Sequence, residues 1–242
     1  MLFFTVIFMK KNFFNLTKFE LLLWITSLTI ITLSFLFCQN YDFVVLIASL
    51  IGGTALIFVS KGNPIGQILT VVFALFYGYI SIKFRYYGEM IIYLGMTAPM
   101  AISATVSWLR NPFEKSKAEV KVALIGKKKV FFLCVSAVAV TVVFYFILKY
   151  FDTPNLILST VSVFTSFLAS MLTFYRNKYY ALAYAANDVI LIALWVLASI
   201  EKTSYIPMVA CFVIFLANDL YGFYNWQRIE KKQKSLNCVE KV

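Results

Sequence analysis

Two Asn-Asp dipeptides lie inside long apolar stretches of the chain, and they are the side chains best placed to do chemistry. They are Asn187-Asp188 and Asn218-Asp219. An acid in the middle of a bilayer costs at least about 2.5–3.5 kcal/mol, so each should face protein or a watery cavity. Each acid lies seven residues from one end of its stretch, roughly 10 Å deep at 1.5 Å per residue. The sequence therefore predicts one polar layer shared by two antiparallel neighbouring helices.

Aromatic and amide residues accompany these acids at helical spacings of three, four and seven. Aromatic rings stack on flat heterocycles, while amides and carboxyl groups hydrogen-bond to hydroxyls, so the set suits a flat ring that carries a sugar. The candidate substrate-binding residues are Tyr180, Tyr184, Asn187, Asp188 and Trp195 on one stretch, Asn218, Asp219, Tyr221 and Asn225 on the next, and Gln67 on an earlier one.

An alternative interpretation gives these polar residues a purely structural role. Amides and acids also hydrogen-bond between membrane helices and hold a bundle together, and for Gln67 the two interpretations are equally supported. For Trp226 we favour a place in the aromatic belt at the membrane surface, where Trp and Tyr are enriched.

Eight apolar stretches of 19–23 residues must position these side chains, and each is long enough to cross a hydrocarbon core of about 30 Å as a helix. Hydrophobic residues make up 62% of the 242 positions, which a soluble domain would not carry. The fold class predicted is an all-α membrane protein. The stretches are 20–38, 42–60, 64–82, 86–108, 130–148, 155–174, 181–200 and 205–226.

The cations sort to one side of such a bundle. With the amino terminus inside, the outer connections hold four, namely Lys83, Arg85, Lys149 and Lys202, which leaves 18 of the 22 cations inside. The positive-inside rule then predicts a multi-pass protein of a bacterial-type inner membrane with both termini in the cytoplasm. The net charge of +11 is explained by these loops, so we expect anionic lipid and no nucleic acid as the partner.

Enzyme and cofactor chemistry find little support in the sequence. Histidine is absent, and the four cysteines lie far apart with no C-x-x-C motif, so we expect no metal site and no disulfide. No phosphate-binding loop, nucleotide motif or Ser-His-Asp set occurs. We therefore expect no enzyme activity, no cofactor and no coupling to ATP.

A weak internal repeat organises the chain. At an offset of 118, Tyr87 falls on Tyr205, Trp108 on Trp226 and Arg110 on Arg228. This predicts parallel three-helix repeats joined by a linker helix, a 3+1+3 plan, with one extra helix in front. The predicted divisions are 1–41 (N-terminal segment and extra helix), 42–108 (first repeat), 109–154 (basic loop and linker helix), 155–226 (second repeat) and 227–242 (basic tail).

The last predicted helix resembles that of the PnuC-type vitamin transporters, whose best-known members take up nicotinamide riboside. The matching run is Phe-Leu-Ala-Asn-Asp-Leu-Tyr-Gly-Phe-Tyr-Asn-Trp over 215–226, and the stretch from Tyr87-Gly88-Glu89 to Trp108-Leu109-Arg110-Asn111-Pro112 is also similar to the family. The resemblance spans most of the chain. It implies a SWEET-like plan, import of a ribosylated vitamin by facilitated diffusion, and trapping of the solute inside as a phosphate.

One departure concerns the solute. The family's binding helix usually carries Trp-x-x-Trp-x-x-x-Asn, and here the same register reads Tyr180, Ala183 and Asn187. Nicotinamide riboside is the first expectation, with a nucleoside, deoxynucleoside, thiamin or riboflavin as the alternative within the family. A membrane receptor or membrane-bound enzyme is a remote alternative, and a homo-oligomer is compatible with the sequence.

Overall fold

Helices account for nearly all of the computed structural model, which describes residues 16–38, 42–83, 87–114 and 119–239. In this part of the chain, eight helical segments are long and apolar enough to cross a membrane, as predicted. Seven are single helices: α2 (Lys18–Leu36), α3 (Phe43–Ser60), α4 (Pro64–Lys83), α7 (Lys127–Tyr150), α8 (Leu156–Phe174), α9 (Tyr180–Glu201) and α10 (Ile206–Val239). The fourth crossing is built from α5 (Tyr87–Ile91), η1 (Ile92–Thr97) and α6 (Ala98–Arg110).

Side-chain caps fix where several of these helices begin. Thr17 and Glu20 form a capping box at the start of α2, in which each side chain accepts from the other's backbone nitrogen. Asp42 accepts from the Val44 nitrogen at 2.8 Å before α3. Pro64 is the first residue of α4, where its missing N–H leaves no helical bond unmade.

The fourth crossing widens into a π-helical turn at η1, just before Pro99. A proline inside a continuous helix removes one backbone hydrogen bond and clashes with the preceding turn. Here the turn opens instead, and the Thr97 hydroxyl donates to the Ile92 carbonyl at 3.2 Å. The wide turn carries Tyr93, which belongs to the candidate site described below.

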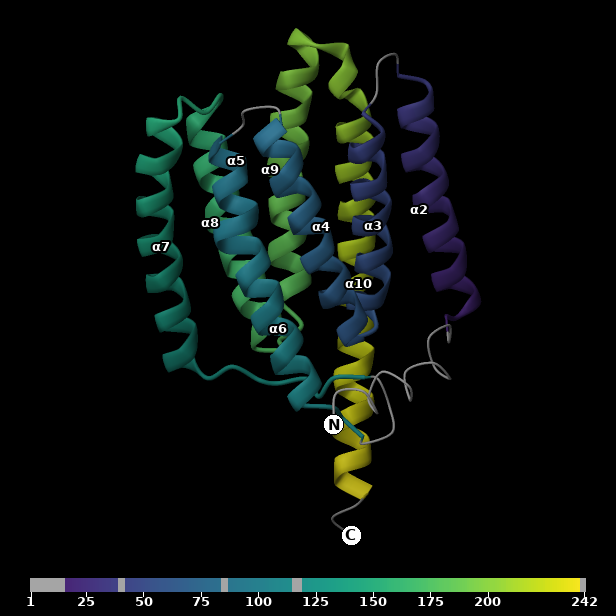
Figure 1. The fold of residues 1–242 in the computed structure, drawn as a ribbon. Helices are drawn as coiled ribbons and strands as arrows, with labels where there is room; N and C mark the ends of the chain where they lie inside the picture. The colour runs from purple at the N-terminus through teal and green to yellow at the C-terminus, as the bar shows by residue number, and fades with distance from the viewer. Residues whose placement is uncertain (1–15, 39–41, 84–86, 115–118, 240–242) are drawn as a thin grey trace.

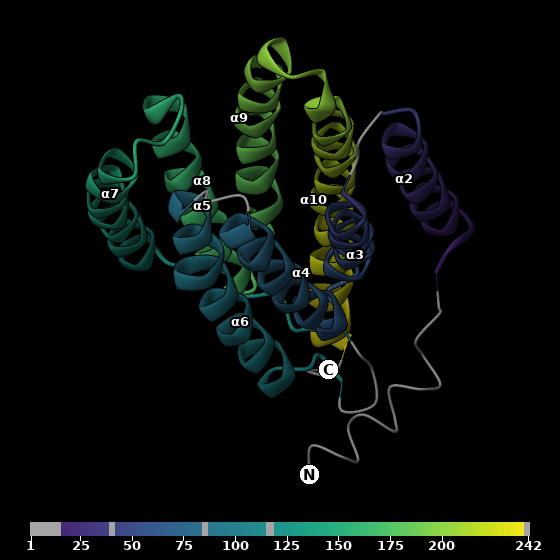
Figure 2. The same ribbon diagram turned by 45° about the horizontal axis from the view of Figure 1, so that its top comes forward.

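Six of the crossings form a closed ring, and two lie outside it (Figures 1 and 2). Neighbours in the ring follow the order α3, α4, α6, α8, α9, α10 and back to α3. Helix α2 packs outside on α3 and α10, and α7 packs at the opposite edge on α8. Two trios, α3–α4–α6 and α8–α9–α10, are therefore joined along α3–α10 and α6–α8. This order is what a twofold axis between repeats would produce, and the axis itself stays a prediction.

One end of the bundle, here called the basic end, is where α3, α6, α8 and α10 finish and α2, α4, α7 and α9 start (Figure 1). The sequence predicts a basic tail from residue 227, but α10 continues as one helix to Val239. Its extension holds the segment that follows α6: Gln233 accepts from the Val122 nitrogen at 2.9 Å and donates to the Val120 carbonyl at 3.0 Å. The sequence of this region does not predict such packing, because the contacts are between distant segments.

The connection between α8 and α9 is also tied to this extension. Lys178 pairs with Glu230 of α10 at 2.8 Å, and this hydrogen bond raises the pKa of Lys178. The Asn177 amide donates to the Ala123 carbonyl at 3.0 Å. At the basic end, the extension of α10 thus packs on the segment after α6 and on the connection between α8 and α9.

Candidate functional site

Asp188 of α9 and Asp219 of α10 lie in direct contact inside the ring. Both are buried, with 4% of each residue exposed, and their carboxyl groups interact across the two helices. One oxygen of Asp188, Oδ2, is buried without a hydrogen-bond partner in the described part of the chain. A buried acceptor without a donor is costly in apolar surroundings. This oxygen is therefore suited to accept from a hydroxyl or an N–H of a bound solute.

Asn187 is held by the neighbouring helix α8. Its Oδ1 accepts from the Ser162 hydroxyl at 3.0 Å and from the Thr165 hydroxyl at 2.9 Å. The two bonds fix which way the amide points, and an amide can donate as well as accept. Asn187 is therefore an oriented group beside the acid pair.

An aromatic cluster that sequence reasoning missed fills the ring next to the acids. Tyr77 of α4 packs on Tyr93 of η1 with ring centroids 4.9 Å apart and on Phe73 at 4.7 Å, and Phe215 of α10 completes the cluster. Tyr93 lies close enough to Asp188 for the two groups to interact electrostatically. Aromatic faces beside carboxyl groups suit a flat, polar or cationic ring.

A sequence signal for the aromatic cluster does exist on α4. Gln67, Thr70 and Tyr77 recur at intervals of three and seven, which places them on one helical face. The wide turn that points Tyr93 inward leaves no comparable pattern.

Gln67 and Tyr184 meet at a small cavity between the two trios. Its volume is about 10 Å³, which is room for about one water. Tyr184 and Ser170 share a hydrogen bond of 3.1 Å at its wall. The lining residues come from α4, η1, α6, α8 and α9: Gln67, Thr70, Thr97, Met100, Ala101, Ala104, Ser170, Thr173 and Tyr184. A ring-bearing solute needs several hundred Å³, which this cavity does not offer in the conformation described.

Tyr180 lies one helical turn closer to the basic end than Tyr184. It belongs to a buried cluster with Trp108 and Trp226 that closes this end of the bundle. Its ring meets that of Trp226 at a centroid distance of 4.9 Å, and its hydroxyl donates to the Val59 carbonyl at 3.4 Å. Trp226 is fully buried, so the prediction of a surface belt position is wrong. Gly222 permits this packing, since a Cβ there would lie 3.2 Å from the Tyr180 hydroxyl.

Trp195 lies away from the acid pair, toward the opposite end of the bundle. It stacks on Phe212 of α10 with the rings 12° from parallel and contacts Tyr205 at a centroid distance of 5.5 Å. Trp195 follows Asp188 by seven positions, or about two helical turns, which separates them by roughly 10 Å along α9. Phe212 packs on Phe215 at a centroid distance of 5.6 Å, so the structure brings Trp195 to the aromatic cluster and not to the acid pair.

The other predicted stripe on α10 faces out of the ring, toward α2 and α3. The Asn218 amide donates to Ser27 of α2 at 3.0 Å, and the Tyr221 hydroxyl donates to Glu20 of α2 at 3.0 Å. Asn225 donates to the carbonyl of Ser60 at 3.0 Å. The structure thus separates these three residues from Asp219, and it gives each of them a partner in the packing between helices.

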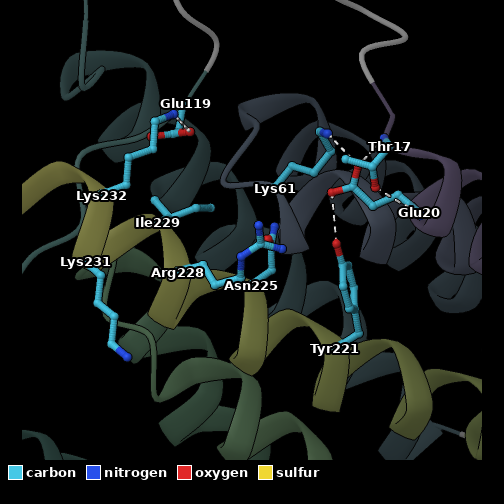
Figure 3. Close-up of a pocket in the computed structure, with 10 residues that line it drawn as sticks. All are labelled: Thr17, Glu20, Lys61, Glu119, Tyr221, Asn225, Arg228, Ile229, Lys231 and Lys232. Carbon is cyan, nitrogen blue, oxygen red and sulfur yellow. Dashed lines mark hydrogen bonds and ion pairs between the residues drawn. The ribbon is translucent and has the colours of Figure 1, made fainter.

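Tyr221 and Asn225 instead line a second, larger pocket at the basic end (Figure 3). Its volume is about 470 Å³. Glu20 stands at one side, where it pairs with Lys61 at 2.8 Å, and Glu119 with Lys232 stands at the other. The lining comprises Thr17, Glu20, Lys61, Glu119, Tyr221, Asn225, Arg228, Ile229, Lys231 and Lys232.

Comparison with known proteins shows which family the chain belongs to. The family model described as the nicotinamide mononucleotide transporter matches residues 42–228, a range that contains both trios and α7. The chain belongs to this transporter family. A curated relative, the nicotinamide riboside transporter PnuC of Neisseria mucosa, is 24% identical over 227 residues, which cover 92% of this chain and 86% of the relative.

A solved structure shares the fold. The crystal structure of the vitamin B3 transporter PnuC superimposes with a TM-score of 0.77 over 90% of this chain and 94% of the other, at 23% sequence identity. The predicted resemblance to PnuC-type proteins is confirmed, and the chain is a multi-pass membrane protein. The family and the solved structure are transporters, in agreement with the expectation that the chain is not an enzyme.

Proposed function

We propose that this chain carries nicotinamide riboside across the membrane by facilitated diffusion, as a uniport, and that phosphorylation traps the solute inside. The observation that supports the solute most directly is the similarity to a nicotinamide riboside transporter over 92% of the chain. The inner cluster agrees with it chemically, because aromatic faces suit a pyridinium ring and the Asn187 amide and the acids suit its carboxamide and ribose hydroxyls.

Solute binding in this proposal takes place between the trios. Asn187, Asp188 and Asp219 hydrogen-bond the solute, while Tyr184 and Gln67 line its path through the small cavity. The trios then rock about the site, so that it opens to one side at a time, as in transporters built from parallel repeats. The Trp108–Trp226 contact closes the basic end in the conformation described here.

The other predicted ligands receive different roles. Tyr180 packs at the start of α9, and Asn218, Tyr221 and Asn225 hold α2 and α3 against α10. These contacts favour a structural role for the four residues, while Trp195 supports the aromatic cluster through Phe212.

A second candidate solute is a nucleoside or another vitamin of the same family. Ala183 favours it, because the family's motif usually places a second Trp there. A site without that ring favours a larger heterocycle, such as a purine.

The proposed setting is a bacterial-type inner membrane with the basic end in the cytoplasm. Its cations then face the anionic lipid of the inner leaflet. A homo-oligomer is compatible with this setting, since apolar side chains of α7 such as Phe131, Val142 and Phe146 remain exposed.

Purified protein in liposomes tests the proposal. Labelled nicotinamide riboside should equilibrate across the membrane without ATP and without an ion gradient. A strict requirement for a proton gradient would defeat the uniport. Uptake of thymidine or thiamin in place of nicotinamide riboside would transfer the proposal to the second candidate.

A further inference from the structure

The pocket at the basic end has the chemistry of an anion site, and the transport proposal does not use it. Four cations and two acids line it: Lys61, Arg228, Lys231 and Lys232 against Glu20 and Glu119. Its volume of about 470 Å³ lies in the range of small-molecule sites.

Both acids of this pocket already have donors. Glu20 accepts from Lys61 at 2.8 Å and from the Thr17 nitrogen at 2.7 Å through one oxygen, and from Tyr221 through the other. Glu119 accepts from Gln233 at 2.9 Å. Among the described residues these carboxylates pair with Lys61 and Lys232 and not with Arg228. Since four cations face two acids, the lining carries a net positive charge.

Arg228 is the cation that this arrangement leaves available. Among the described residues it forms no ion pair, and its one close aromatic contact is with Tyr224, whose ring centroid is 5.8 Å away. In the view of Figure 3 its guanidinium lies between Lys61 and the Glu119–Lys232 pair, while Lys231 points away. A guanidinium fork matches a phosphate with two parallel hydrogen bonds.

The rest of the wall suits an organic group attached to that phosphate. Tyr221 lines the pocket with an aromatic ring, 5.3 Å from the Phe19 ring, and Asn225 contributes an amide. Polar lining beside a ring and a guanidinium favours a phosphorylated sugar with a flat base over a bare inorganic ion.

The pocket also joins parts that transport must move. Lys61 follows α3 of the first trio, Arg228 lies on α10 of the second trio, and Glu20 lies on the outer helix α2. A phosphate that bridges Lys61 and Arg228 would tie the two trios together at the basic end, and rocking of the trios would then cost the bridging hydrogen bonds.

We propose that this pocket binds the phosphate of a phosphorylated, ring-bearing metabolite on the cytoplasmic side, and that the bound metabolite slows transport. The identity of the metabolite rests on the proposed function, because trapping by phosphorylation makes such a product inside the cell. Binding involves no covalent step. The result is feedback, in which accumulated product holds the carrier closed.

Isothermal titration of the purified full-length chain with nicotinamide mononucleotide, in detergent without anionic lipid, tests the site. Arg228→Gln should weaken binding about tenfold or more, since hydrogen bonds to charged groups are strong. The affinity of Arg228→Lys should lie between those of the wild type and Arg228→Gln, because lysine keeps the charge but loses the forked pair of donors. Lys128→Gln is the matched control: it removes one exposed cation of α7 at the same end and should leave the affinity unchanged.

A second pair of measurements separates this pocket from the transport site. Asn187→Leu should lose affinity for nicotinamide riboside and keep its affinity for the mononucleotide. Arg228→Gln should lose affinity for the mononucleotide and keep its affinity for nicotinamide riboside. Mononucleotide enclosed in liposomes should slow uptake by the wild type and not by Arg228→Gln. If nicotinamide riboside is not transported at all, the proposed function fails while the titration still decides the pocket.

Three results would overturn the proposal. The first is absence of mononucleotide binding, and the second is equal loss in Arg228→Gln and Lys128→Gln. The third is loss of mononucleotide binding in Asn187→Leu, which would place the metabolite at the transport site. A lipid phosphate is the other source of the same chemistry. If phosphatidylglycerol vesicles, but not phosphatidylcholine vesicles, abolish mononucleotide binding in an Arg228-dependent way, the pocket belongs to the lipid and the metabolite is excluded.

Discussion

Trp108 and Trp226 pack against each other with ring centroids 5.4 Å apart, and each indole caps the first helix of the opposite trio. Trp108 Nε1 donates to the Thr173 carbonyl at 2.8 Å, and Trp226 Nε1 donates to the Val59 carbonyl at 3.0 Å. Thr173 and Val59 are the penultimate residues of α8 and α3. The last four carbonyls of a helix lack partners within it, and each of these two accepts a backbone N–H of the following turn and an indole N–H of the opposite trio.

Removing either indole donor should destabilise the bundle to a similar extent. Trp108→Phe and Trp226→Phe each remove one donor to a buried carbonyl, while the Arg176 nitrogen still donates to Thr173 and the Gly62 nitrogen to Val59, both at 2.9 Å. The expected cost is therefore that of one net hydrogen bond, about 0.5–1.5 kcal/mol. The double variant should lose less than the sum of the two, because the rings are in contact. Thermal unfolding in detergent measures this.

Trp24→Phe provides the control for that experiment. Trp24 donates to Thr54 at 3.2 Å between α2 and α3, outside the contact between trios. Unequal losses in Trp108→Phe and Trp226→Phe would argue against the symmetric role.

The fold could be predicted closely from the sequence because hydropathy and charge report on crossing and direction. The start of α4 at Pro64 and the ends of α3 at Ser60 and α8 at Phe174 fall where predicted. The offset that paired Trp108 with Trp226 also paired two residues that touch. These features depend on local signals or on a repeat, and both are visible in one sequence.

Which neighbouring helix each polar side chain faces could not be predicted in the same way. Asn218 and Asp219 are adjacent in the chain, but one faces α2 and the other faces α9. Helical periodicity separates the two faces, but it does not say that an extra helix covers one of them. The aromatic cluster around Tyr93 was missed because its orientation depends on the π-helical turn.

Asn187→Leu should weaken binding of the transported solute about tenfold or more. The leucine removes a group that donates and accepts, and a buried partner left unpaired costs about 1–3 kcal/mol. Ser162→Ala should have a smaller effect, because Thr165 still donates to the Asn187 oxygen at 2.9 Å. Titration of purified protein with nicotinamide riboside measures both. Unchanged affinity in Asn187→Leu at normal membrane levels would move the site elsewhere.

Asp219→Asn should weaken solute binding less than Asn187→Leu does, and less than Asp188→Asn does. An amide at 219 can still donate to Asp188, so the contact between α9 and α10 survives. An amide at 188 replaces the buried Oδ2 that has no partner among the described residues and that we expect to accept from the solute. Equal losses of affinity in the two variants would show that the acids act only as a pair.

Both termini should lie in the cytoplasm. Reporter fusions after Lys241, and within 152–155 between α7 and α8, measure this: the first should report inside and the second outside. The basic end described above holds the start of α2 and the end of α10, so the two fusions must give opposite results. An outside location for the first fusion would reverse the proposed orientation.

Ala183→Trp should shift solute preference toward nicotinamide riboside. Ala183 stands where the family usually carries Trp, one residue before Tyr184 of the cavity wall. Stacking of a base on an aromatic side chain is worth about 1–3 kcal/mol per base in single-stranded nucleic-acid sites, so a restored ring should improve affinity for a small pyridinium ring and exclude a purine. Competition of labelled nicotinamide riboside with deoxyguanosine, thymidine and thiamin should be measured for both proteins. If the wild type binds only nicotinamide riboside and Ala183→Trp does not improve it, Ala183 does not set specificity. The nucleoside alternative would then lose its support.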